Sequence, residues 1–97
     1  MSYHISKMVG LEFDAAIDAT IAALQAEGFG VLTDIDVAAT MQKKLGATFR
    51  PYRILGACNP RMAHEALKLE DKVGTMLPCN VIVQQHDDGA VEVSAVG

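Results

Sequence analysis

Residues 79–96 read CNVIVQQHDDGAVEVSAV, and this stretch decides the fold class. After the turn signal Asp87-Asp88-Gly89, Val91 and Val93 alternate with Glu92 and Ser94, and before it Cys79, Val81 and Val83 share one side. We therefore expect two strands, Cys79 to Gln85 and Ala90 to Val96. Because so short a connection joins strands of opposite direction, these residues predict an antiparallel hairpin.

Upstream of this hairpin, helix-like and strand-like stretches alternate. Glu12 to Glu27 is rich in Ala, repeats apolar residues at steps of three or four, and precedes Gly28, so it predicts a helix. Asp36 can cap a second helix from Val37 to Leu45. Asn59-Pro60 opens a third helix, because Asn favours the cap and Pro is tolerated at the first helical position. The remaining predicted strands are Tyr3 to Val9, Phe29 to Ile35 and Pro51 to Ala57.

The predicted order is βαβαβαββ in a single domain of residues 1–97. Alternating strands and helices usually indicate a parallel sheet between two helix layers. Ninety-seven residues hardly fill three layers, and several strands have only one apolar side. We therefore predict an α+β fold, a two-layer sandwich of one five-stranded mixed or antiparallel sheet with helices on one face. The other face would be partly apolar, and a homodimer would cover it.

The composition excludes several classes of protein. Twelve Asp+Glu against eight Lys+Arg give a net charge of −4, and there is no Trp, so nucleic acid is not an expected partner. The chain has no apolar stretch that would span a bilayer and no signal-peptide pattern at its start, so we expect a cytoplasmic protein that does not bind membranes. Two cysteines are too few for a disulfide scaffold.

Both cysteines lie at changes of chain direction and both precede an asparagine. Cys58 closes a strand before a helix N-terminus, a position that favours the thiolate, and Cys79 opens a strand after Pro78. If these strands run antiparallel, the two sulfurs would be neighbours that could form a disulfide or share a soft metal ion. If the strands run parallel, the pair is separated. The competing interpretation is core packing, since free cysteine is commonly buried.

Other polar residues near this region have both structural and chemical interpretations. Asn59 fits a helix cap, and Asn80 could bond to nearby backbone. His64 could approach Cys58 and form a nucleophile pair or two metal ligands, or it could be an ordinary surface histidine. A basic set could hold an anion near the third helix, or form a solvated face: Lys43, Lys44, Arg50, Arg53 and Arg61. Asp34 and Asp36 fit capping and surface roles.

These segments together resemble the bacterial and archaeal family called domain of unknown function 302. The resemblance covers nearly the whole chain, and its most specific parts are the Gly-x-Cys-Asn-Pro and Leu-Pro-Cys-Asn segments. It implies a compact α+β domain that is usually a dimer, and it implies no activity, substrate or cofactor. One departure is Val96-Gly97, where family members often carry Asp-Pro. The matching segments are GFGVLT (28–33), IDV (35–37), KLG (44–46), YRILGACNP (52–60), Gly74 and LPCNV (77–81).

The sequence therefore predicts a small cytoplasmic homodimeric domain that binds a small molecule or a soft metal ion. The candidate ligand-binding residues are Cys58, Asn59, His64, Cys79 and Asn80, with Cys58 and Cys79 as candidate metal ligands. No residue is assigned a catalytic role, no cofactor is named, and enzymatic activity stays open. The alternative is a structural or protein-interaction module in which both cysteines belong to the core.

Overall fold

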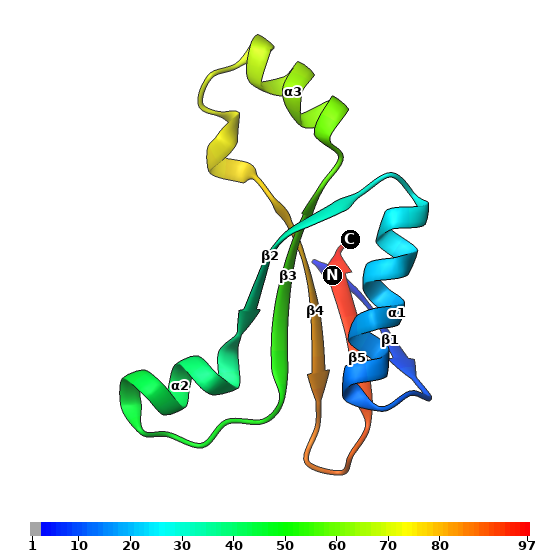
Figure 1. The fold of residues 1–97 in the computed structure, drawn as a ribbon, viewed down its shortest axis with the longest axis vertical. Coiled ribbons are helices and arrows are strands. Elements are labelled where there is room, and N and C mark those ends of the chain that lie inside the picture. Colours follow the sequence, from blue (N-terminus) through cyan, green and yellow to red (C-terminus); the bar gives the residue numbers. More distant parts are fainter. Residues whose placement is uncertain (1–2) are drawn as a thin grey trace.

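The structure is a computed structural model that describes residues 3–97. Its five strands form one sheet in the order β1-β5-β4-β3-β2, and every neighbouring pair is antiparallel (Figure 1). Each boundary that the sequence predicts lies within one residue of the observed one, η1 is an addition, and the α+β prediction is confirmed. The elements are β1 (His4–Val9), α1 (Phe13–Ala26), β2 (Gly30–Asp36), α2 (Val37–Leu45), β3 (Tyr52–Cys58), α3 (Pro60–Leu69), the 3-10 helix η1 (Val73–Met76), β4 (Cys79–Gln85) and β5 (Val91–Val96).

The predicted hairpin is formed by β4 and β5. Gln85 pairs with Val91, and the backbone N–H of His86 donates to the carbonyl of Ala90 at 2.8 Å. Gly89 has a φ of 88°, a conformation that other residues rarely adopt. The outer strand β1 then pairs with β5, from His4 opposite Val96 to Val9 opposite Val91. The first and last strands of the chain are therefore neighbours.

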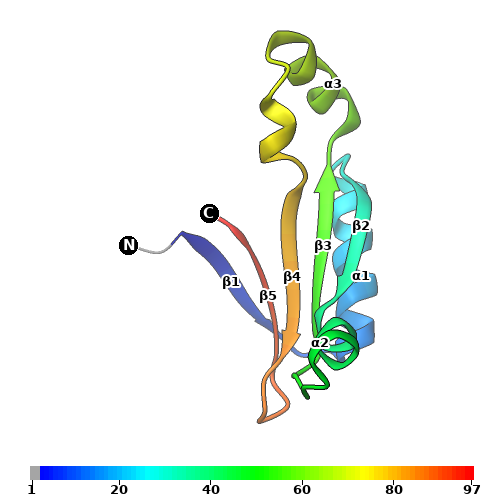
Figure 2. The same cartoon turned by 90° about the vertical axis from the view of Figure 1, so that its left-hand side faces the viewer.

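One face of the sheet, which we call the α1 face, carries the buried core. Ala16 and Ile17 of α1 pack against Leu55, Val83 and Val91 of the sheet, and all five side chains are buried. Figure 2 shows the sheet edge-on with α1 along one side. The opposite face, which we call the open face, has no helix packed against it within residues 3–97. This arrangement confirms the predicted two layers.

The second and third helices begin where the sequence predicts and for the expected reasons. The Asp36 carboxylate accepts from the backbone N–H of Ala39 at 2.9 Å, and Asn59 Oδ1 accepts from that of Met62 at 3.2 Å. Gly46 ends α2 in the left-handed conformation. Helix α3 and η1 pack mainly against each other, and they project beyond the end of the sheet (Figures 1 and 2). We call this unit, residues 60–76, the arm.

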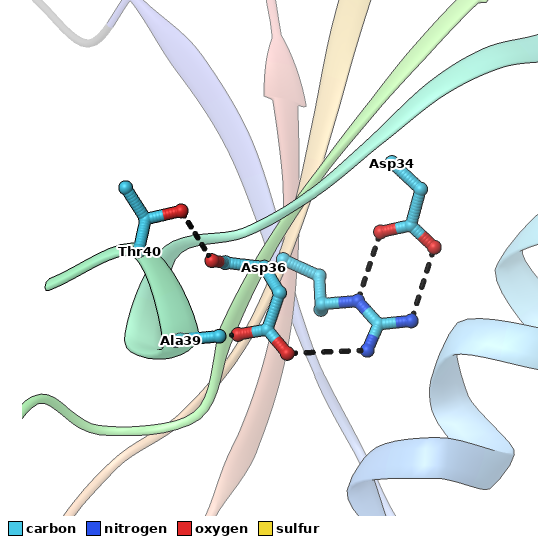
Figure 3. A network of polar contacts seen from close by, with 5 residues as sticks. Asp34, Asp36, Ala39 and Thr40 are labelled. Atoms are coloured by element: carbon cyan, nitrogen blue, oxygen red, sulfur yellow. Dashed lines mark hydrogen bonds and ion pairs between the residues drawn. The ribbon is translucent and has the colours of Figure 1, made fainter. Parts of the chain in front are cut away.

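Two carboxylates on β2 share one guanidinium on β3. Arg53 donates through Nε to Asp34 Oδ1 at 2.8 Å and through Nη2 to Asp34 Oδ2 at 3.0 Å, while its Nη1 lies 3.9 Å from Asp36 Oδ2 (Figure 3). The bond to Asp34 raises the pKa of Arg53, against the smaller opposing effect of burial. Asp36 therefore both caps α2 and helps to orient Arg53. The predicted capping role of Asp36 is confirmed.

On the open face, Gly56 lies very close to the side chains of Thr33 and Pro78. A Cβ on Gly56 would overlap Thr33 Oγ1 and would lie 2.6 Å from Pro78 Cγ. Asn80, which pairs with Gly56 across the sheet, is the next nearest group. The glycine of Gly-x-Cys-Asn-Pro and the proline of Leu-Pro-Cys-Asn are therefore complementary packing partners.

We predict that Asp36→Ala lowers the free energy of unfolding by about 1 kcal/mol, because an orphan backbone N–H of α2 loses its acceptor. Urea unfolding followed by circular dichroism measures the change. Asp36→Asn keeps an oxygen for the cap, and it should lose less. An equal loss in both variants would show that the charge near Arg53, rather than the cap, matters at this position.

We also predict that Gly56→Ala destabilises the protein by about 1–3 kcal/mol, because the added methyl group has no space beside Thr33 and Pro78. Gly30→Ala is the matched control, since Gly30 also lies in a strand and a Cβ there meets nothing within 4 Å. The two unfolding midpoints in urea should differ clearly. Equal midpoints would refute the packing role of Gly56.

Candidate functional site

The two cysteines lie at the same end of the sheet, but they are not directly opposite each other in neighbouring strands. Strands β3 and β4 are antiparallel, as the cysteine-pair prediction requires. Ala57 pairs with Cys79, whereas Cys58 lies one residue further and pairs with Gly30 of β2. Because successive side chains of a strand point to opposite faces, Cys79 points to the α1 face and Cys58 to the open face. The register therefore directs the two thiols away from each other.

Neither cysteine belongs to the buried core. Cys58 is half-buried and Cys79 is exposed, and both are free thiols. The core-packing interpretation is therefore wrong for Cys79. No group of three or more His, Cys, Asp or Glu side chains among the described residues could hold a metal ion.

The neighbouring polar residues divide between the arm and the open face. Asn59 caps α3, as described above, and Asn80 lies on the open face beside Gly56. His64 is exposed on α3 and makes no hydrogen bond or ion pair within residues 3–97. The site residues predicted from the sequence therefore lie around one end of the sheet, and no hydrogen bond joins any two of them within residues 3–97.

The basic residues singled out in the sequence are separated in the structure. Arg61 lies at the start of α3, whereas Arg50 and Arg53 lie at the opposite end of β3, about 20 Å away for a strand of this length. Arg53 is paired with Asp34. Arg50 lies over the rings of Phe49 and Tyr52, with its guanidinium carbon 4.6 Å and 5.5 Å from the ring centroids. Arg50, Arg53 and Arg61 therefore do not gather into an anion site near the third helix.

Sequence reasoning missed a groove on the open face. It has a volume of about 420 Å³ and crosses β1, β5, β4 and β3. The signal was a small polar residue on the side that faces away from the core in three of these strands, namely Ser6 in β1, Asn80 in β4 and Ser94 in β5. Six residues that line it are Ser6, Tyr52, Asn80, Ile82, Glu92 and Ser94.

Comparison with known proteins gives a consistent picture. The family model described as "Domain of unknown function DUF302" matches residues 5–97. A crystal structure of an uncharacterised conserved DUF302 protein from Bacillus stearothermophilus is similar to this chain, with a TM-score of 0.88 and 32% identity. The match covers 99% of this chain and 74% of that one. No curated protein matches. Among the described helices, none has the length and apolar character to cross a membrane.

We predict that mild oxidation of the native protein gives no Cys58–Cys79 disulfide within one chain, because the thiols point to opposite faces. Thiol titration should show rapid reaction of Cys79 and slower reaction of Cys58, and equal rates after unfolding. Mass spectrometry without reductant checks the disulfide, with Cys58→Ser and Cys79→Ser as controls. A loss of two hydrogens that disappears in either variant would contradict the register.

Proposed function

The chain belongs to the DUF302 family of domains of unknown function, and we propose that it acts as a homodimeric domain whose subunits associate through the arm. The family supplies no activity, so the proposal depends on the surface of this chain. One observation carries it: the arm is an amphipathic helical unit whose large apolar side chains stay exposed although α3 and η1 pack against each other.

The exposed side chains of the arm are those that normally form a core. Met62, Leu69 and Met76 are 67%, 88% and 78% exposed, and Leu67 is 44% exposed. The polar side of α3 carries Glu65 and Lys68, which form an ion pair with each other at 3.5 Å. A ten-residue helix is only marginally stable in water without packing, so α3 needs a surface that covers this apolar side.

The accessible surface of the chain supports a large interface. It measures 6,850 Å², which exceeds the value for a folded monomer of 10.3 kDa by about 1,500 Å². The radius of gyration, 14.8 Å, likewise exceeds the roughly 12.5 Å of a compact chain of this length. A standard interface removes about 800 Å² from each partner. The surplus is therefore large enough for a stable dimer.

The charges of the arm favour a second copy of this chain as the partner. Residues 60–76 contain three basic and three acidic side chains, so the arm is neutral although the whole chain carries a net charge of −4. Two arms can therefore approach each other without net repulsion. The three acidic side chains are Glu65, Glu70 and Asp71, and the three basic ones are Arg61, Lys68 and Lys72.

Binding of a small molecule or soft metal ion near Cys58 and Cys79 is the second candidate function. The exposure of Cys79 supports it, because packing gives no reason for a thiol at this position. The opposed directions of the two thiols count against a metal ion shared within one subunit. Elemental analysis of the purified protein, and of Cys79→Ala, tests this candidate. We also propose a cytoplasmic location, since two free thiols suit a reducing compartment.

For the dimer, we predict that sedimentation equilibrium gives twice the 10.3 kDa chain mass. Leu69→Lys combined with Met76→Lys should convert it to a monomer, because four charges would then be buried at the interface of each dimer. Both residues are exposed in the subunit, so its fold should persist, as circular dichroism would show.

The matched control is Leu45→Lys, an equally apolar and 74% exposed residue on α2 at the other end of the molecule. This variant should remain dimeric. A monomeric wild-type protein would refute the proposal. So would dissociation of Leu45→Lys while the arm variant stays dimeric.

A further inference from the structure

We propose that the groove on the open face binds a small, uncharged, hydroxyl-rich molecule of the size and chemistry of a monosaccharide. Neither the arm nor either cysteine lines this groove, so the inference does not depend on the proposed dimer. Its volume, about 420 Å³, lies in the range of small-molecule sites.

Two polar side chains in the groove are buried although no helix covers this face. Gln84 is 9% exposed and Ser94 is 8% exposed. Gln84 Oε1 accepts from Arg50 Nε at 2.9 Å, and the Ser94 and Ser6 hydroxyls are hydrogen-bonded at 2.7 Å. A further bond of 2.7 Å joins Ser6 Oγ to His4 Nδ1. These bonds hold the polar groups of the groove in position before any ligand arrives, which lowers the entropic cost of binding.

The groove also contains an apolar floor and a fixed aromatic ring. Ile82 lies on β4 between the polar residues Asn80 and Gln84, which line the same groove. Tyr52 pairs with Gln84 across β3 and β4. The Tyr52 ring is held by an edge contact to Phe49, with centroids 6.0 Å apart, and by the guanidinium of Arg50. An apolar surface beside fixed hydrogen-bonding groups matches a sugar, whose C–H faces are apolar and whose edge carries hydroxyls.

The charges in the groove favour an uncharged ligand. Among the described residues that line it, Glu92 is the only Asp, Glu, Lys or Arg side chain. Its carboxylate already bonds to His86 Nε2 at 2.9 Å. An anion would therefore meet no lysine or arginine in the lining, and would face a carboxylate. The hydroxyls of Ser6, Ser94 and Tyr52 and the amide of Asn80 both donate and accept, as the hydroxyls of a sugar do.

The experiment is a titration of ¹⁵N-labelled protein with ribose and with glucose, followed by amide chemical shifts. We expect saturable shifts centred on Ile82, Gln84 and Ser94 for at least one sugar. Inorganic phosphate and ethylamine are the charged probes, and they should not saturate these amides. Ser94→Ala and Asn80→Ala should each raise the dissociation constant about three- to tenfold, the effect of one lost hydrogen bond.

Thr48→Ala, on the exposed loop before β3, is the matched control and should bind like the wild-type protein. Asn80 is exposed, so its variant tests the site even if Ser94→Ala alters the fold. Absence of saturable shifts with both sugars would overturn the proposal, and so would stronger saturation by phosphate or ethylamine. Dissociation of a dimer by Ile82→Lys, without unfolding, would also overturn it, because a second copy would then cover this face.

Discussion

The packing of α1 against the middle of the sheet is the contact on which the rest of the structure depends. Ile17 and Ala16 cover Leu55, Val83 and Val91, which come from three different strands. One helix of fourteen residues is the main cover for five strands, so only one face of the sheet can be buried within the subunit. The open face follows from this shortage of covering helix, because α3 lies in the arm beyond the sheet and does not cover it.

This shortage explains why the polar and apolar residues outside the core are distributed unevenly. On the open face, small polar side chains and a few apolar ones form a groove that remains compatible with water. On the arm, the apolar side chains are concentrated along one side of a short helix. The first pattern suits a small ligand and the second suits a protein surface. The proposed ligand groove and the proposed dimer surface therefore lie in separate parts of the chain.

The sequence predicted the elements well because residues that start or end a helix, or form a turn, mark many of their boundaries. Asp36 and Asn59 cap helices, and Gly89 allows a tight turn, and such signals act within a few residues. The sequence could not show which face each cysteine occupies. That depends on a register between strands, where a shift of one residue reverses the face. The apolar side chains of α3 are visible in the sequence, but the exposure of Met62 and Leu69 follows only from the position of the arm beyond the sheet.

The pairing of β1 with β5 has a consequence for how the chain folds. Strands β2, β3, β4 and β5 follow one another along the sheet in sequence order, so each of their pairings closes a loop of limited length. The pairing of His4 with Val96 instead joins residues at opposite ends of the chain. Closing so long a loop costs more conformational entropy than forming the other pairs. The outer strand is therefore expected to join last, onto a four-stranded sheet that has already been assembled.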